Sequence, residues 1–211
     1  MNTAITSEQI YNALLALCET IEQQKEYLSE VDGAIGDGDH GVNMAKCFRG
    51  VKAKLETADK GDVGAILGLV GMEVMNSVGG AMGALYGTMF INMSTRSVGK
   101  SEVTLNDLSN MFADALTGIL TIGKAKVGDK TLVDTLSPAV LALEQAATQQ
   151  LPLAEGLVRF ETAANKGMES TRDMLAKMGR ASRLGERSIG HLDAGATSCY
   201  FILSAFANAG K

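Results

Sequence analysis

The chain has 211 residues, a formal net charge of −5 and three cysteines. This length is enough to bury one hydrophobic core, and we predict a single domain over residues 1–211. The acidic balance argues against nucleic acid and anionic lipid as partners, because both are bound by clustered Lys and Arg side chains. The cysteines are widely spaced and form no C-x-x-C pair, so neither a disulfide framework nor a zinc site is expected. The N-terminus lacks the features of a secretory signal, and we expect a cytoplasmic protein.

Hydrophobic periodicity predicts helices along almost the whole chain. The first helix begins after Thr6, which forms a capping box with Gln9. The apolar face of this helix consists of Ile10, Leu14, Leu17 and Ile21. Further helical segments are predicted at residues 41–57, 62–78, 82–97, 104–124, 129–149, 153–176 and 196–208. Short glycine-bearing segments separate the eight predicted helices and no strand pattern is visible, which predicts a compact all-α fold. Pro138 is expected to bend or break the sixth helix near Ser137.

An uncharged stretch, VMNSVGGAMGALYGTMFINMST, covers residues 74–95 and spaces Gly79, Gly83 and Gly87 four residues apart. A membrane span is disfavoured, because much of the stretch is Gly, Ser, Thr and Asn and no cluster of Lys or Arg flanks it. Two interpretations stay open. The glycines either admit the backbone of a neighbouring helix or let a flat ligand come close.

The segment IGDGDHG, residues 35–41, combines two aspartates with three glycines, and a third aspartate precedes it. The carboxylates of Asp32, Asp37 and Asp39 are spaced too irregularly for one helix face, whereas the glycines let the backbone curl around a centre. Mg²⁺ prefers carboxylate oxygens and shares its octahedron with water and phosphate, so a site for Mg²⁺ and a nucleotide is one interpretation. The other is a solvated Asp-Gly turn ahead of the helix that starts near Gly41.

Two further segments carry groups that suit anions. GDKTLVD, residues 128–134, places backbone N–H groups and the Thr131 hydroxyl at a helix start, which fits an anion site or a plain N-cap. Residues 179–198 gather basic side chains before a second Asp-Gly loop; these are Arg180, Arg183, Arg187 and His191. They favour a phosphate clamp, with ordinary surface ion pairs as the alternative. The sequence contains neither a P-loop nor a Rossmann glycine pattern after a strand.

Four separated motifs, GDGDHGVNM, SVGGAMGALYGT, VGDKTLVD and GRASRLGERSIGHLDAGATS, resemble those of the nucleotide-binding L subunits of dihydroxyacetone kinases. They occur in the same order, and the resemblance covers essentially the whole chain. It implies an all-α barrel of eight antiparallel helices that holds ADP or ATP and two Mg²⁺ ions at one end. It also implies a phosphotransferase subunit without a nucleophile of its own, since phosphoryl transfer depends mainly on positioning and charge neutralisation.

Carried over position by position, the resemblance makes Asp32, Asp37 and Asp39 the Mg²⁺ ligands. The nucleotide contacts that it implies are His40, Gly41, Val42, Asn43, Gly80, Ala81, Met82, Gly123, Thr131, Leu132, Arg180, Asp193, Ala194 and Gly195. Ala194 stands where many relatives have proline, and Val127 replaces another frequent proline. Two loops are therefore expected to be less rigid, while no ligand is lost.

In relatives coupled to the sugar phosphotransferase system, ADP stays bound and a phosphohistidine donor, the M subunit, converts it to ATP. The ATP then phosphorylates dihydroxyacetone held by a separate K subunit. The resemblance implies both partners for this chain, because the L-like domain uses all of its residues. Two alternatives remain open: an L-type subunit of a kinase that uses exchangeable ATP for another small ketose or acyl substrate, and a non-catalytic nucleotide sensor that acts on a regulator.

Overall fold

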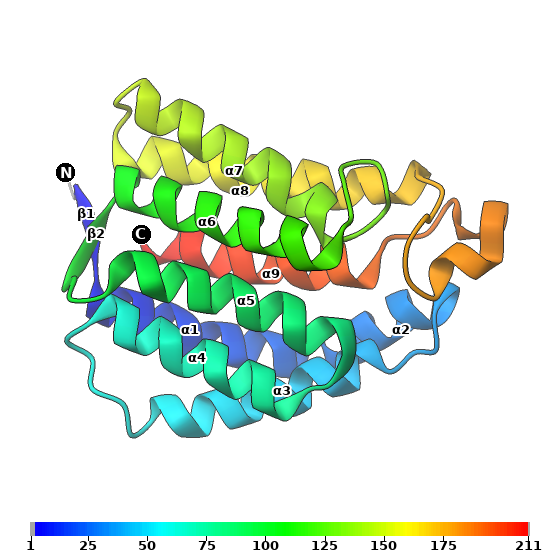
Figure 1. Ribbon diagram of the computed structural model, residues 1–211, viewed down its shortest axis with the longest axis horizontal. Coiled ribbons are helices and arrows are strands. Elements are labelled where there is room, and N and C mark those ends of the chain that lie inside the picture. The colour runs from blue at the N-terminus through cyan, green and yellow to red at the C-terminus, as the bar shows by residue number, and fades with distance from the viewer. Residues whose placement is uncertain (1–2, 211) are drawn as a thin grey trace.

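The computed structural model describes residues 3–210 and is mostly helical, as the sequence predicted (Figure 1). The elements in chain order are β1 (Ala4–Thr6), α1 (Ser7–Gln23), α2 (Lys25–Ile35), α3 (His40–Leu55), α4 (Val63–Ser77), α5 (Gly80–Ser97), β2 (Glu102–Thr104), α6 (Leu105–Gly123), α7 (Leu132–Thr148), α8 (Leu153–Ser170), the 3₁₀ helices η1 (Thr171–Asp173) and η2 (Ala181–Ser188), and α9 (Ala194–Ala209). The long helices follow the long axis of the molecule, with the two strands at one end and α2 at the other (Figure 1).

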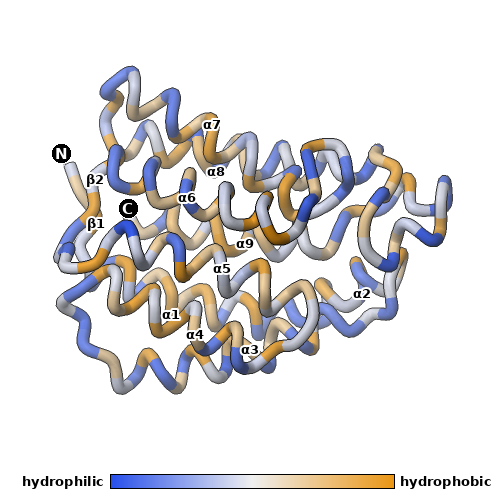
Figure 2. The backbone as a smooth tube through the Cα atoms, viewed as in Figure 1, coloured by the Kyte–Doolittle hydropathy of each residue, from blue (hydrophilic) through white to orange (hydrophobic). Residues whose placement is uncertain are grey.

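The contacts between helices close a circuit. From α3 to α9, each helix packs against the next one along the chain, and α1 packs against both α3 and α9. Between the helices lies one cluster of buried apolar side chains, in which the ring of Phe112 packs at 4.9 Å from that of Phe160 and at 5.3 Å from that of Phe206. Figure 2 shows hydrophobic positions recurring between hydrophilic ones along the helices, as expected of helices that bury one face.

Several helix starts follow the predicted side-chain chemistry. The Thr6 hydroxyl accepts a hydrogen bond from the Gln9 N–H at 3.2 Å, and the Gln9 side chain accepts one from the Thr6 N–H at 3.0 Å. The predicted capping box of the first helix is therefore confirmed. Reciprocal capping of the same kind also starts α6 and α7, where the N-cap residues are Thr104 and Thr131.

The predicted element list is wrong in two places. Residues 25–35 form α2, so the described residues contain nine α-helices rather than eight. Its buried residues are Leu28 and Ile35 alone, and two buried positions are too few for a periodic apolar signal. The two strands were also not predicted: they pair antiparallel with Ala4 opposite Thr104, and each is three residues long, which is too short for a visible alternation.

The prediction that Pro138 would bend or break its helix near Ser137 is wrong as to the break, because α7 runs without interruption from Leu132 to Thr148. Proline cannot donate to the carbonyl of the residue four positions earlier, here Asp134. That carbonyl lies against Gly167 of α8, where a Cβ atom would collide with it. The absence of a side chain at Gly167 therefore lets α8 pack closely at the point where α7 lacks a hydrogen bond.

The uncharged stretch 74–95 forms the end of α4, a short turn and most of α5. A Cβ atom at Gly83 would collide with the Val78 carbonyl, and one at Gly87 would collide with the Met75 side chain. These two glycines therefore admit a neighbouring backbone and side chain, as one interpretation held. Gly79 and Gly80 have open space around them. Within residues 3–210, no helix is long and apolar enough to cross a membrane.

Candidate functional site

A cavity of about 670 Å³ opens at the end of the helices that lies away from the two strands. Its walls come from the junction of α2 and α3, the turn between α4 and α5, the end of α6, the start of α7, residues 178–181 and the start of α9. Gly80 adopts φ 70° at the start of α5, a backbone conformation that glycine tolerates without strain, and it leaves the cavity wall bare of side chain. Segments far apart in the sequence thus meet at one site.

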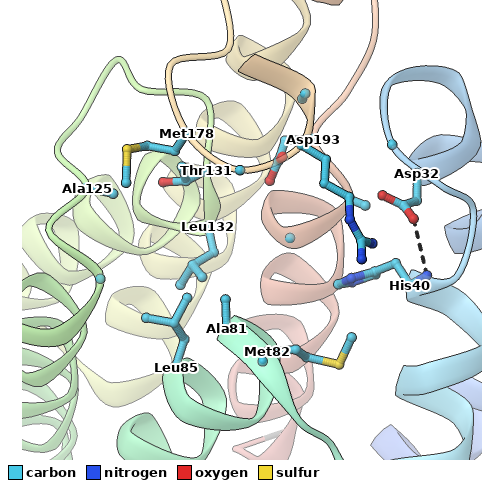
Figure 3. A pocket seen from close by; sticks show the side chains of 18 of the residues that line it. Asp32, His40, Ala81, Met82, Leu85, Ala125, Thr131, Leu132, Met178 and Asp193 are labelled. Carbon is cyan, nitrogen blue, oxygen red and sulfur yellow. Dashed lines mark hydrogen bonds between the residues drawn. The ribbon is translucent and has the colours of Figure 1, made fainter. Parts of the chain in front are cut away.

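Three carboxylates gather at one side of this cavity. Asp32, Asp37 and Asp39 each offer one oxygen, and these oxygens lie within 4.8 Å of one another. Asp32 projects from the last turn of α2 and accepts a hydrogen bond from the His40 N–H at 3.3 Å (Figure 3). Asp37 and Asp39 lie in the turn before α3 and are exposed. Part of the cluster is therefore held by a helix, and not by a loop alone as the spacing had suggested.

The cluster concentrates negative charge that a cation would relieve. Carboxylates this close repel one another, and hard oxygen ligands of this kind suit Mg²⁺. In the structure the Arg180 guanidinium makes an ion pair with Asp37, and its Nη1 lies 3.7 Å from Asp39 Oδ2. The residues present fit a divalent cation, and the neighbouring arginine fits the phosphates of a metal-bound nucleotide.

A neutral polar network lies next to the carboxylates. His40 Nε2 lies 2.8 Å from Ser198 Oγ, which lies 2.6 Å from the Tyr86 hydroxyl; that hydroxyl donates to the Gly195 carbonyl at 2.8 Å. Burial lowers the pKa of His40 and raises the pKa of Tyr86 well above its usual value, so both groups are neutral near pH 7. Sequence reasoning missed Tyr86 and Ser198, because neither hydroxyl stands out from the other hydroxyl residues beside it, such as Thr88 and Thr197.

The opposite side of the cavity is apolar. Figure 3 shows Leu85, Leu132 and Met178 on the side of Ala125, away from Asp32 and His40. Ile119 and Ile122 of α6 extend this apolar wall. The cavity therefore presents a hydrophobic surface and a charged surface to one ligand, which fits a molecule with a flat ring at one end and anionic groups at the other.

Most of the predicted nucleotide contacts line this cavity. They are His40, Asn43, Gly80, Ala81, Met82, Gly123, Thr131, Leu132, Arg180, Asp193, Ala194 and Gly195. Gly41 and Val42 are not among the lining residues: Gly41 is buried where a Cβ atom would collide with the Lys25 carbonyl, and Val42 is exposed. Arg183 and Arg187 are exposed and also lie outside the lining, so of the three arginines in this segment Arg180 is the one that borders the cavity.

The segment 128–134 is a helix cap. Asp134 accepts hydrogen bonds from the N–H groups of Gly128 at 2.6 Å and Thr131 at 2.8 Å, and the Thr131 hydroxyl accepts from the Val133 N–H at 3.2 Å. The N-cap interpretation is confirmed, and it leaves fewer free N–H groups for an anion than the sequence suggested. Thr131 nevertheless borders the cavity.

Asp193 caps α9 at the inner wall of the cavity. Its carboxylate accepts a hydrogen bond from the Ala196 N–H at 2.7 Å, and burial raises its pKa to about 6. The pKa of this group is higher in the folded chain than in the unfolded chain. The folded state therefore binds more protons between about pH 4 and pH 6, and the stability that this provides is lost as the pH rises through that window.

Replacing Asp193 by asparagine is expected to raise the stability of the ligand-free protein at pH 8 by about 1–3 kcal/mol and to change little at pH 4. Asparagine caps a helix as well as aspartate does and carries no charge to desolvate. Urea unfolding at the two pH values measures the effect. Asp62, the N-cap of α4, is the matched control. Burial acts to raise the pKa of Asp62, but hydrogen bonds from backbone N–H groups outweigh it and lower the pKa below its usual value. Asp62→Asn should lose stability at pH 8, and an equal response of both variants would contradict the assignment.

Comparison with known proteins gives a consistent result. Residues 34–208 match the DAK2 domain. The chain is 41% identical over 208 residues to the PEP-dependent dihydroxyacetone kinase, ADP-binding subunit DhaL, of Escherichia coli K12, covering 99% of each chain. It is 40% identical over 184 residues to the PTS-dependent dihydroxyacetone kinase, ADP-binding subunit DhaL, of Lactococcus lactis, covering 87% of this chain and 88% of that one.

Among solved structures, the fold matches the dihydroxyacetone kinase from C. freundii in complex with AMP-PNP and Mg²⁺. The TM-score is 0.69 at 22% identity, over 94% of this chain and 33% of that chain. At this identity the likeness shows the fold alone. The match to the two subunits, by contrast, extends over most of the length of each.

Proposed function

Because this chain belongs to the DAK2 domain family, we propose that it is the ADP-binding subunit of a cytoplasmic dihydroxyacetone kinase that draws phosphoryl groups from the phosphotransferase system. One observation carries the proposal: a single cavity joins three clustered carboxylates to an apolar wall, at an open end of the helices. Similarity over most of the chain to proteins named as ADP-binding subunits of PEP-dependent or PTS-dependent dihydroxyacetone kinases supports the same proposal.

Different residues of the cavity would bind the metal ions, the phosphates and the base of the nucleotide. Asp32, Asp37 and Asp39 would hold two Mg²⁺ ions, which neutralise phosphate charge during phosphoryl transfer. The first turn of α3 starts at His40, so the N–H groups of residues 41 and 42 have no carbonyl acceptor within the helix. They suit phosphate oxygens, which would explain a role for Gly41 and Val42 through their backbone. The apolar wall around Leu85 and Leu132 would receive the base.

The eight helices other than α2 would form a closed antiparallel barrel, and residues 1–211 would form one domain. The contact circuit from α1 through α3 to α9 and back supports this arrangement. α2 contacts α3, α9 and η2, beside the cavity. In this description α2 extends one end of the barrel, where it presents Asp32.

Two partners would use the same open end. A phosphohistidine on an M subunit would pass its phosphoryl group to bound ADP, giving ATP and free histidine. The ATP would then pass its γ-phosphoryl group to the hydroxyl of dihydroxyacetone on a K subunit, giving dihydroxyacetone phosphate and restoring ADP. This chain would contribute the nucleotide, its metal ions and their positioning, and no nucleophile.

The test is reconstitution with phosphoenolpyruvate, the general phosphotransferase proteins, an M subunit, a K subunit and this chain. Dihydroxyacetone phosphate is expected to form in large excess over the ADP supplied. A system that needs stoichiometric ATP and ignores phosphoenolpyruvate would instead identify a kinase with exchangeable nucleotide. Binding of ADP without transfer to any ketose would identify a nucleotide sensor.

A further inference from the structure

Lys130 is almost completely buried, with 1% of its surface exposed, although it carries a charged group. Its ammonium has three N–H donors, which reach four backbone carbonyls with one donor shared: those of Thr171 at 2.7 Å, Met174 at 3.2 Å, Ser188 at 2.7 Å and His191 at 2.5 Å. An ammonium group is tolerated away from water only when its donors are satisfied, and these carbonyls provide that. All four belong to one segment, residues 171–193, which we call the cap segment.

The turn that presents Lys130 is itself rigid. Lys130 has a φ of 61°, which is uncommon for a residue other than glycine, and the Asp134 carboxylate binds the N–H groups on either side of it. The same turn meets the cap segment a second time, because the Lys177 N–H donates to the Asp129 carbonyl at 3.1 Å. The start of α7 is thus the anchor to which the cap segment is tied.

The cap segment has little regular structure of its own. It contains the 3₁₀ helices η1 and η2, with a left-handed glycine, Gly185, inside η2. Ser188 fastens it internally: its buried hydroxyl donates to the Gly185 carbonyl at 2.7 Å and accepts from the Ala176 N–H at 3.0 Å. The Thr171 carbonyl accepts from the Met174 N–H at 3.2 Å as well as from Lys130, so the Lys130 contact joins the hydrogen bonds inside the segment.

Arg180 is carried by this segment. Residues 178–181 line the cavity, and the Arg180 guanidinium reaches the carboxylates of Asp37 and Asp39. The position of Arg180 relative to the carboxylates therefore depends on where the cap segment lies.

We propose that Lys130 is a positioning residue that holds the cap segment over the cavity and so places Arg180 against the phosphates of the bound nucleotide. The consequence for phosphoryl transfer rests on the function proposed above. The role of Lys130 in holding the cap segment over the cavity does not depend on that function, because it concerns contacts within this chain alone. Lys130 borders the cavity, but its ammonium donates only to carbonyls of the cap segment and not to the carboxylate cluster, so it acts on Arg180 through the backbone of the segment.

Hydrogen exchange of the ligand-free protein tests the closure. In Lys130→Met, amides of residues 174–190 are expected to exchange about tenfold faster or more, while those of α4 and α6 keep wild-type rates. Lys166→Met is the matched control, since Lys166 is an exposed lysine of α8, and it should leave the cap segment unchanged. Should Lys130→Met loosen the whole fold, Ser188→Ala provides the second variant and should speed exchange in the same residues to a smaller extent. Unchanged cap exchange in both variants overturns the proposal.

A double-mutant cycle tests the action through Arg180. Lys130→Met and Arg180→Ala should each slow phosphoryl transfer, and the double variant should be little slower than Arg180→Ala alone. Additive losses, or a Lys130→Met variant with wild-type transfer, would overturn the positioning role. If the wild-type protein itself transfers no phosphoryl group, the proposed function fails. In that case the exchange rates still decide whether Lys130 closes the cap segment.

Discussion

Replacing Asp37 by asparagine is expected to lower the affinity for ADP in the presence of Mg²⁺ by at least about 100-fold, since even groups behind a metal ligand contribute about 10- to 100-fold. The substitution keeps the shape of the side chain and removes one of three charges that lie within 4.8 Å of one another. The helices should be unaffected, because Asp37 is exposed and lies between α2 and α3. Calorimetric titration of ADP with and without Mg²⁺ measures the affinity, and circular dichroism measures the helical content.

Asp59→Asn is the matched control for this prediction. Asp59 lies between α3 and α4, where its side chain accepts a hydrogen bond from the Gly61 N–H at 2.9 Å, and it is outside the cavity lining. Its replacement should leave nucleotide affinity unchanged. The assignment of the metal site would be wrong if alanine variants of Asp32, Asp37 and Asp39 all bound ADP with wild-type affinity.

Replacing Arg180 by alanine is expected to slow both half-reactions, the charging of ADP and the transfer to dihydroxyacetone, by roughly 10- to 150-fold. A hydrogen bond to a charged group contributes about 1.5–3 kcal/mol, and this range corresponds to that loss. Rapid-mixing measurements with each partner separately follow the two steps. Arg183→Ala is the control, since Arg183 belongs to the same basic segment and does not line the cavity.

The ion pair of Arg180 with the carboxylates adds a second, opposite effect. Without nucleotide, the guanidinium competes with a cation for Asp37 and Asp39. Arg180→Ala should therefore bind Mg²⁺ more tightly than the wild type in the absence of ADP, while it transfers phosphoryl groups more slowly. Weaker Mg²⁺ binding by the variant would contradict this prediction. It would show that Arg180 helps to form the metal site, and that it does not leave the carboxylates to bind the phosphates when the nucleotide arrives.

Local signals in the sequence were sufficient for most helices and for several caps. Thr6 with Gln9 predicted the start of α1, and the run from Thr131 to Asp134 predicted a cap at the start of α7. These interactions join residues three positions apart, so a short window of the sequence contains both partners. The carboxylate cluster was also visible, because Asp32, Asp37 and Asp39 lie within eight positions of one another.

Patterns of neighbouring residues did not predict the elements whose structure depends on contacts with distant parts of the chain. α2 buries only two residues and has no periodic apolar face, and β1 needs β2, which lies about a hundred positions away, to form a pair. Pro138 was expected to bend or break a helix that in fact continues past it, and Gly167 of α8 packs close to the Asp134 carbonyl left without its helical donor. Each outcome depends on a partner that a window of adjacent residues does not contain.

By itself the sequence determined a mostly helical chain, the capping of its main helices, the acidic loop and the basic segment that follows η1. The tertiary structure alone decided that Arg180 meets Asp37, that Tyr86, Ser198 and His40 form one network, and that Lys130 holds four carbonyls of a segment some forty to sixty positions later. Periodicity and capping depend on spacings of a few residues, which a sequence displays directly. A cavity depends on which helix ends come together, and that is decided by the packing of all the helices around a common core.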